Sequence, residues 1–185
     1  MPSNQYVGGV LRDYQTIEYM EIEIILTGNF GVGKSALFDR FLYDRFEEAY
    51  TGTIGVRVNQ RDLEVNGETV EVILWDIAGE RTQTKVPVTY FANKEVIIYV
   101  VDLTRPYLFK DIKEDLQYLR KVAPDSQIKL VGNKKDLFEA REIAEIGETA
   151  ELEGMDLLLS AKTGEHVNIL FENIVKSIME VKKEI

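Results

Sequence analysis

Residues 28–35 carry the pattern in this chain with the clearest chemistry, reading Gly28-Asn29-Phe30-Gly31-Val32-Gly33-Lys34-Ser35. The run fits the phosphate-binding loop, which has glycines at both ends and closes on a Lys-Ser pair. The backbone N–H groups of such a loop turn inward toward phosphate oxygens, at the positive end of the helix that follows. Lys34 is placed to reach the β- and γ-phosphates, and the Ser35 hydroxyl to ligate Mg²⁺. The alternative is a glycine-rich turn with a chance Lys-Ser pair.

Three further motifs follow in chain order and suit the same ligand. Asp76-Ile77-Ala78-Gly79 comes directly after a strand pattern, where the carboxylate can hold a Mg²⁺-bound water and the Gly79 N–H can meet a γ-phosphate. In Asn133-Lys134-Lys135-Asp136, the carboxylate can accept from the N1–H and exocyclic amine of guanine, and the amide can serve the other edge of the purine. Ser160-Ala161-Lys162 offers a backbone N–H to the guanine O6. These motifs favour a guanine nucleotide site over a chance turn.

With Thr53-Ile54-Gly55-Val56 added, five motifs occur in order, and from about residue 21 onward the chain resembles the Ras superfamily of small GTPases, most closely the Rab branch. The resemblance implies GTP and GDP as ligands, Mg²⁺ as cofactor, and the small G domain fold of the P-loop NTPases. That fold is a three-layer α/β domain with a six-stranded, mostly parallel sheet, one antiparallel hairpin strand, and helices on both faces.

The resemblance also implies roles for individual positions. Thr53 matches the switch I threonine that ligates Mg²⁺ in the GTP state, Phe46 the aromatic that packs on guanine, and Tyr50 the switch I tyrosine. Ordinary surface or core aromatics are the alternative for the two rings, and solvated charges for Lys134 and Lys162. The expected nucleotide-binding residues are Asn29, Phe30, Gly31, Val32, Gly33, Lys34, Ser35, Ala36, Phe46, Tyr50, Thr53, Gly79, Asn133, Lys134, Asp136, Ser160, Ala161 and Lys162. The expected metal set is Ser35, Thr53 and, through water, Asp76; the expected catalytic set is Glu80, Lys34, Thr53 and Gly79.

Two positions depart from the family pattern in ways that bear on hydrolysis. Glu80 stands where the family has the glutamine that orients the attacking water, and it brings negative charge toward a transition state that needs charge neutralised. Phe30 stands where the family has a small residue close to the γ-phosphate. We therefore expect slow hydrolysis. The alternative is that Glu80 points to solvent and Phe30 folds over the nucleotide, at an ordinary slow rate, with Arg81 or Gln83 able to compensate.

Two functional hypotheses follow: an enzyme-switch that cycles slowly between GTP and GDP, and a GTP-held interaction module without a lipid anchor. Either would meet effectors, exchange factors and activating proteins through residues 53–58 and 75–90. Val58, Trp75 and Tyr90 match the aromatic triad with which Rab proteins read effectors, and two of the three are aromatic here. The alternative is that Trp75 and Tyr90 fill core.

Short β-rich runs alternate with helical patterns, as expected of the elements that position these motifs. Asn66-Gly67, between two alternating runs, predicts a tight hairpin. The alternation reads as one α/β domain whose ligand binds beyond the carboxyl ends of the strands. We expect a G domain over 21–185 and an N-terminal extension of unknown order over 1–20. The expected strands are 22–27, 57–65, 69–75, 97–101, 128–131 and 157–159, with helices over 34–43, around 108–119, and from 167 to the end.

The composition of the 185 residues narrows the class of protein. A net charge of −10 argues against nucleic acid as a partner, and an ordinary hydrophobic fraction of 45% fits a globular domain. The absence of cysteine excludes disulfides and prenylation of the chain as given. We expect a cytoplasmic protein. The end at Ile185, directly after the last helix, is expected to mean that a tail was removed, that the domain comes from a larger protein, or that the protein acts without a lipid anchor.

Overall fold

The computed structural model describes residues 20–48, 52–149 and 152–183. Residues 1–19 of the extension predicted over 1–20, and the predicted site residue Tyr50, lie outside this part of the chain, whereas Met20 is the first residue of a strand. The helices and strands are β1 (Met20–Thr27), α1 (Lys34–Tyr43), β2 (Val56–Val65), β3 (Glu68–Ile77), β4 (Val96–Asp102), α2 (Ile112–Val122), β5 (Gln127–Asn133), α3 (Ala140–Gly147), β6 (Leu157–Leu158) and α4 (Val167–Lys183). Single 3₁₀ turns are η1 (Gln83–Lys85), η2 (Val88–Tyr90), η3 (Pro106–Asp111) and η4 (Lys135–Leu137).

Within the described residues the strands form one six-stranded sheet in the order β2-β3-β1-β4-β5-β6. β2 pairs antiparallel with β3, and every other neighbouring pair is parallel. The turn between β2 and β3 is the predicted one: Asn66 and Gly67 both have positive φ, 53° and 79°, as a tight hairpin turn of type I′ requires. The predicted fold class is confirmed.

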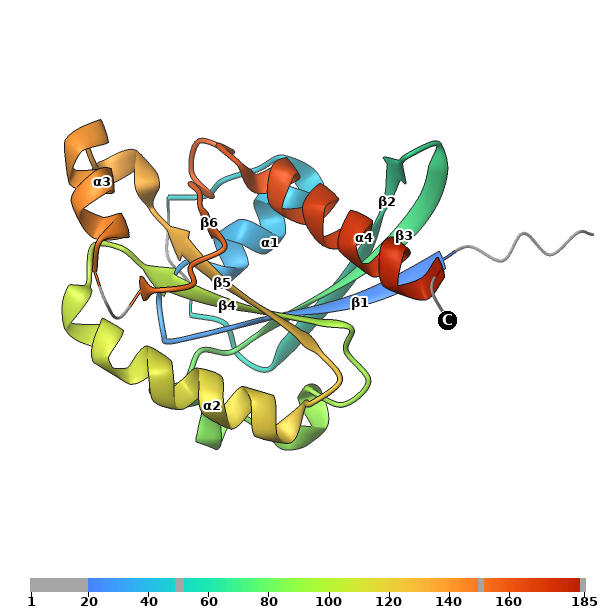
Figure 1. Ribbon diagram of the computed structural model, residues 1–185, viewed down its shortest axis with the longest axis horizontal. Coiled ribbons are helices and arrows are strands. Elements are labelled where there is room, and N and C mark those ends of the chain that lie inside the picture. Colours follow the sequence, from blue (N-terminus) through green and yellow to red (C-terminus); the bar gives the residue numbers. More distant parts are fainter. Residues whose placement is uncertain (1–19, 49–51, 150–151, 184–185) are drawn as a thin grey trace, which may run out of the picture.

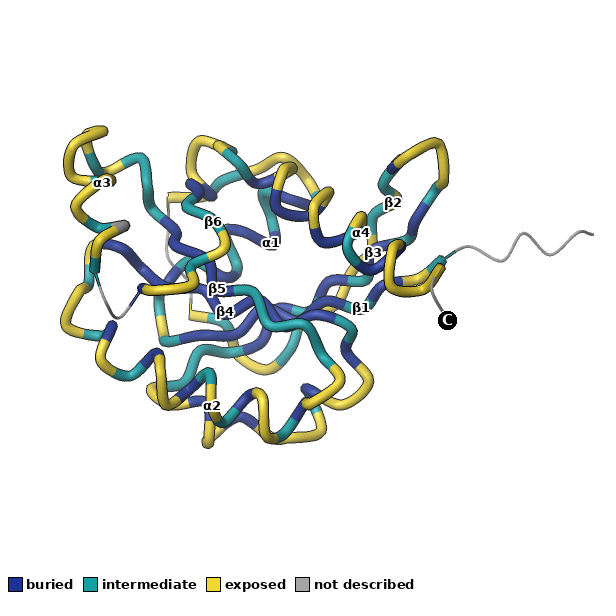
Figure 2. The backbone as a smooth tube through the Cα atoms, in the orientation of Figure 1, coloured by how far each residue is buried: buried dark blue, intermediate teal, exposed yellow. Residues whose placement is uncertain are grey.

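Two hydrophobic cores lie on opposite faces of the sheet, because alternate residues of each strand point to opposite sides. In β1, Ile22, Ile24 and Leu26 join the core under α1 and α4, whereas Ile25 joins the core under α2. Figure 1 shows α1 and α4 above the sheet and α2 below it, and Figure 2 shows the strands buried between them. All seven residues of β4 are buried, which accounts for its uniformly apolar pattern.

Three segments differ in detail from the sequence expectation. The helical spacing around 108–119 begins as the 3₁₀ turn η3 and becomes α-helical only at Ile112. Helix α3 was not predicted, and its first turn carries only a weak signal: the Glu142 carboxylate accepts the N–H of Glu139, three residues earlier, at 2.8 Å. Strands β3, β4 and β5 extend two or fewer residues beyond the expected bounds at each end, as is usual for element boundaries.

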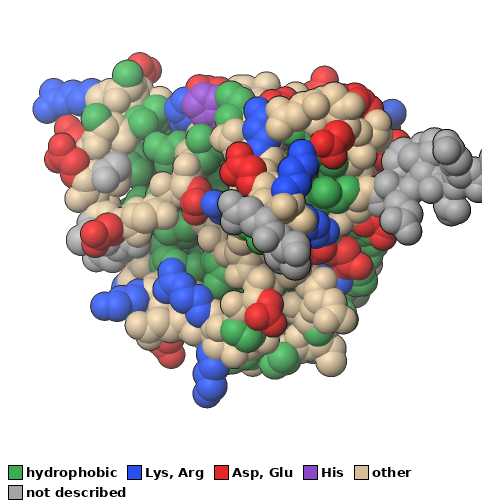
Figure 3. All heavy atoms as spheres, turned by 45° about the vertical axis from the view of Figure 1, so that its right-hand side comes forward, with side chains coloured by type: hydrophobic (Ala, Val, Ile, Leu, Met, Phe, Trp, Pro, Cys, Tyr) green, Lys and Arg blue, Asp and Glu red, His purple; other side chains and the backbone are tan. Residues whose placement is uncertain are grey.

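The carboxyl ends of β1, β3, β4 and β5 face the same edge of the sheet, because these strands are parallel. The glycine loop leaves β1 at this edge, and the motifs beginning at Asp76 and Asn133 lie at the ends of β3 and β5. Acidic and basic side chains are interspersed on the face drawn in Figure 3. None of the helices in the described part of the chain is long and apolar enough to cross a membrane.

Candidate functional site

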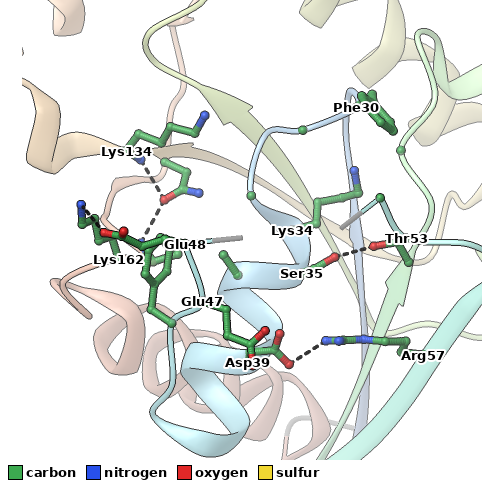
Figure 4. Close-up of a pocket in the computed structure, with 18 of the residues that line it drawn as sticks. Phe30, Lys34, Ser35, Asp39, Glu47, Glu48, Thr53, Arg57, Lys134 and Lys162 are labelled. Carbon is green, nitrogen blue, oxygen red and sulfur yellow. Dashed lines mark hydrogen bonds and ion pairs between the residues drawn. The ribbon is translucent and has the colours of Figure 1, made fainter. Parts of the chain in front are cut away.

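The loops at the carboxyl edge of the sheet enclose a pocket of about 510 Å³, a size typical of small-molecule sites. Figure 4 shows side chains from the glycine loop, switch I and the two late motifs converging on it. Of the predicted binding residues, the lining contains Phe30, Gly31, Gly33, Lys34, Ser35, Ala36, Phe46, Thr53, Gly79, Asn133, Lys134, Asp136, Ala161 and Lys162. Predicted Val32 and Ser160 are buried, and the Asn29 side chain donates to the carbonyl of Arg81 at 3.4 Å.

The glycine loop packs so closely against Asn133 that no residue larger than glycine fits at position 33. Gly33 has φ +96°, and a Cβ there would lie 2.3 Å from Nδ2 of Asn133. Only glycine combines this backbone with this distance. Helix α1 begins at the next residue, so its N-terminal N–H groups face the pocket and favour an anion there.

Lys34 is the buried cation of the pocket. Its Nζ donates to the carbonyl oxygens of Gly28 at 3.1 Å and Asn29 at 3.0 Å, within the same loop. Burial lowers the pKa of Lys34 to about 8, while Asp76 opposes the shift and Arg105 adds to it. The loop therefore holds an ammonium that gains from a nearby negative charge such as phosphate.

Three oxygen-bearing side chains meet at the start of α1. The hydroxyls of Ser35 and Thr53 lie 2.6 Å apart, as Figure 4 shows. Asp76, at the end of β3, is fully buried, and neither carboxylate oxygen has a hydrogen-bond partner. Two hydroxyls and one unsatisfied carboxylate fit Mg²⁺, which binds few protein oxygens and fills its octahedron with phosphate and water. The described residues contain no group of three or more His, Asp or Glu side chains placed to hold a metal by themselves.

The two late motifs are bonded into one unit behind the pocket. Asn133 joins the two motifs, since its Oδ1 accepts the Ala161 N–H at 3.0 Å. It also contacts the phosphate loop, because its Nδ2 donates to the Val32 carbonyl at 3.0 Å. Ser160 donates its hydroxyl to Oδ1 of Asp136 at 2.5 Å. The structure thus places Asn133 between the loops, and Asp136 is the carboxylate of this unit that lines the pocket.

A sequence model of the Ras family matches residues 23–180. The chain belongs to the Ras family. It is similar to the Ras-related protein SEC4 of Saccharomyces cerevisiae, at 35% identity over 86% of this chain and 75% of that protein. It is also similar to the Ras-related protein Rab-4 of Dictyostelium discoideum, at 34% identity over 85% and 79% of the two chains. Mouse Ras-related protein Rab-12 shares 32% identity over 86% and 68%. The chain is a Rab-like small GTPase, of a family that binds GTP, GDP and Mg²⁺ and works as a switch.

One residue at the phosphate loop was missed by the motif analysis. Arg105, after β4, donates from Nη2 to the carbonyl of Phe30 at 2.9 Å and from Nε to Oδ2 of Asp102 at 2.8 Å. Lys134 reaches the same Asp102 oxygen at 2.6 Å. Burial alone would raise the pKa of Asp102, but the hydrogen bonds from Lys134 and Thr104 outweigh it and hold that pKa below its ordinary value. Arg105 and Lys134 both bind Asp102, and together they connect the phosphate loop to the Asn133–Asp136 motif of this Ras-family site.

Switch II lies against the phosphate loop through a glycine. A Cβ at Gly79 would be 2.7 Å from Nζ of Lys34 and 2.7 Å from Cα of Phe30, so the backbone there approaches as closely as it can. Glu80 follows it, half-buried beside the lining. Gln83 is fully buried, and its Oε1 accepts a hydrogen bond from the Thr27 hydroxyl. Its side chain therefore points into the core and is not placed to orient a water in the pocket. Phe30 lines the pocket with 51% of its surface exposed.

The residues that match the Rab effector triad differ in exposure. Val58 is 47% exposed, whereas Trp75 and Tyr90 are partly buried and pack against the core under α2. The ammonium of Lys94 lies 3.9 Å from the centre of the Trp75 ring, which covers one face of that ring. Ile54, in switch I, is 97% exposed. The exposed large apolar side chains of the predicted partner surface are therefore Ile54, Val58 and Val88, the last 48% exposed.

Proposed function

We propose that this chain is a Mg²⁺-dependent GTP/GDP switch whose intrinsic hydrolysis is slow. The observation that supports the proposal is one pocket to which all five motifs contribute lining residues. In this assignment Lys34 and the loop N–H groups hold the phosphates. Ser35, Thr53 and Asp76 hold the metal, and Asp136 and the Ala161 N–H read the guanine.

Hydrolysis joins the oxygen of a water to the γ-phosphorus and breaks the bond to the β–γ bridging oxygen, releasing GDP and inorganic phosphate. When bound, Mg²⁺ supplies charge neutralisation across the β- and γ-phosphates. Lys34 would neutralise further charge on the leaving side, and the Gly79 N–H would hold the γ-phosphate. The remaining task is to orient the water. Glu80 can accept a hydrogen bond from it but adds negative charge where charge is already accumulating.

A second candidate function is a GTP-held interaction module, in which hydrolysis is too slow to change the state of the protein. Phe30 favours it, because it lines the pocket and its Cα lies close to Gly79. A bulky side chain there obstructs any group that an activating protein inserts toward the γ-phosphate. Both candidates use the same nucleotide site and differ only in turnover.

The first experiment is to denature the purified protein and identify the nucleotide it releases by ion-exchange chromatography. Near-stoichiometric GDP supports the slow switch, and near-stoichiometric GTP supports the GTP-held module. Absence of guanine nucleotide, together with failure to load either GDP or GTP, overturns both. Asp136→Asn should move the preference from guanine toward xanthine nucleotides, and Ser35→Asn should weaken Mg²⁺-GTP binding more than GDP binding.

Turnover is tested separately by single-turnover hydrolysis of loaded GTP in the Glu80→Gln variant. We expect at least a tenfold gain in rate, with GTP affinity within twofold of wild type. Glu114→Gln, an exposed residue on α2, is the matched control and should leave both quantities unchanged. An unchanged rate in Glu80→Gln contradicts the role given to this residue.

A further inference from the structure

Arg57 lies beside the carboxylate assigned to the metal site. It pairs with Asp76 across the antiparallel ladder of β2 and β3, which puts both side chains on one face of the sheet. Nε of Arg57 is 3.4 Å from Oδ2 of Asp76, and its Nη2 is 2.7 Å from Oδ1 of Asp39 on α1. Figure 4 shows Arg57 reaching toward Asp39 below the Ser35–Thr53 pair. The guanidinium thus spans two carboxylates, Asp39, which lines the pocket, and the fully buried Asp76.

Asp76 requires a counter-charge from its surroundings. The residue is fully buried and its two oxygens have no hydrogen-bond partner, so its negative charge is costly unless a cation balances it. Burial raises the pKa of Asp76, and the neighbouring Ser35, Arg57 and Lys34 oppose that rise. Of the two cations, Arg57 makes the direct ion pair, while Lys34 donates to carbonyls of its own loop.

Arg57 is also fixed in place. Its guanidinium carbon lies 4.4 Å from the centre of the Phe38 ring, and its second arm is bound by Asp39. A guanidinium that stacks on a ring and divides its donors between two carboxylates loses little freedom on forming either contact. It is therefore a standing positive charge next to Asp76.

We propose that Arg57 is a built-in counter-ion that competes with Mg²⁺ for Asp76 and thereby sets the Mg²⁺ concentration needed to retain nucleotide. The inference rests on the nucleotide site proposed above. A carboxylate whose charge is shared with a guanidinium attracts a dication less, and the guanidinium repels that dication directly. Removing Arg57 should thus strengthen Mg²⁺ binding, even though it removes an ion pair.

The test measures the release rate of a fluorescent GDP analogue from the full chain as a function of free Mg²⁺. In Arg57→Gln we expect the Mg²⁺ midpoint to fall about tenfold, equivalent to roughly 1.4 kcal/mol. Arg61→Gln is the matched control. Arg61 lies on the same strand and face but bonds the Phe41 carbonyl and lies over the Phe41 ring, so its midpoint should move less than twofold. An unchanged or raised midpoint in Arg57→Gln overturns the proposal.

Two further variants separate competition from a structural role. Arg57→Lys keeps the charge and should hold the midpoint within about threefold of wild type. Arg57→Gln placed in an Asp76→Asn background should not move the midpoint, because the shared carboxylate is gone. A tenfold fall that persists in that background shows that Arg57 acts elsewhere, and overturns the proposal.

Failure of the nucleotide site itself is distinguishable. If wild-type protein binds no GDP analogue at all, the proposed function fails, and the counter-ion pairing is tested alone by thermal unfolding in EDTA. There, Arg57→Gln should lower Tm by a few degrees, and adding Asp76→Asn should restore it, because the uncompensated buried charge is removed. No restoration overturns the counter-ion assignment.

Discussion

Asp115→Ala should release switch II from the body of the domain. Asp115 is a buried residue of α2 whose Oδ1 accepts the backbone N–H of Gln83 at 2.9 Å and whose Oδ2 accepts the Tyr99 hydroxyl at 2.6 Å. Gln83 belongs to η1, the first turn of switch II, and Tyr99 belongs to β4. One carboxylate therefore joins switch II to a helix and to the central sheet.

The magnitude follows from the two donors that lose their acceptor. Tyr99 and Gln83 are both buried, so neither gains water when Asp115 is truncated, and each unsatisfied donor costs about 1–3 kcal/mol. Part of this is offset, because burial raises the pKa of Asp115 and the ionised carboxylate is itself costly to bury. We expect a net loss of about 3 kcal/mol in the free energy of unfolding.

The assay is urea unfolding at pH 7 with fixed excess GDP and Mg²⁺, since ligand binding adds to the apparent stability. The single tryptophan, Trp75, lies on β3 and reports the transition. Glu114→Ala is the control, because it removes an exposed carboxylate from the same turn and should cost less than 0.5 kcal/mol. In a Tyr99→Phe background, the cost of Asp115→Ala should fall by about 1–2 kcal/mol.

Two results would refute this reasoning. Equal losses in the free energy of unfolding for Asp115→Ala and Glu114→Ala would mean that the Asp115 carboxylate does not stabilise switch II. Strict additivity with Tyr99→Phe would mean that the hydroxyl and the carboxylate do not interact. Limited proteolysis of switch II provides a second readout: cleavage should be faster in Asp115→Ala but not in Glu114→Ala.

Four further predictions concern the phosphate loop and the residues that contact it. The pKa of Lys34 falls to about 8, and a bound phosphate favours the ammonium form. GDP affinity should therefore decrease above pH 8 by up to about tenfold per pH unit, and calorimetry in two buffers should show proton uptake on binding. Constant affinity from pH 7 to 9.5 would contradict this prediction. The same shift predicts that ligand-free protein becomes more stable between pH 8 and 10.5, because the unfolded chain then binds more protons. Arg105→Met removes the donor to the Phe30 carbonyl and should speed GDP release about fivefold, near 1 kcal/mol, whereas exposed Arg120→Met should not. Gly79→Ala would bring a methyl within 2.7 Å of Lys34 and should weaken a GTP analogue at least about tenfold more than GDP; equal losses in competition binding would count against the γ-phosphate role.

The parts of the fold that follow local rules could be predicted from the sequence. The helix over 34–43 and the Asn66-Gly67 hairpin have the predicted bounds and dihedral angles, because a glycine N-cap and a two-residue turn act over a few neighbours. The missed helix α3 is short and its carboxylate cap is a weak signal. The opening turn of the 106–122 segment is 3₁₀ where α-helix was expected, and the spacing of apolar residues does not distinguish the two over one turn.

The candidate site also has a part that could be predicted from the sequence and a part that could not. The motifs predicted which segments line the pocket, because the spaced glycines with the Lys-Ser pair and the later Asn-Lys-Lys-Asp run can each be recognised within one loop. The contacts of Arg57, Arg105 and Asp115 could not be predicted, because each depends on a partner 16 to 75 residues away that only strand register and helix packing bring close. An arginine on a polar strand reads equally well as solvated surface until its cross-strand neighbour is known.

We expect retention of nucleotide and turnover of GTP to depend on different residues. Arg57 acts at the metal side and Arg105 at the outer side of the phosphate loop, and both are bound to carboxylates, Asp76 and Asp102. Their charges therefore balance fixed acids and bear on affinity. Glu80 follows the close contact of Gly79 and has no part in these two pairs, and in the proposed mechanism its charge acts on the attacking water. Substitutions at the arginines should consequently change Kd and release rate while leaving the hydrolysis rate of bound GTP nearly constant, and substitution at Glu80 should do the reverse. This reciprocal pattern would show that affinity for the nucleotide and the rate of its hydrolysis are set by different residues.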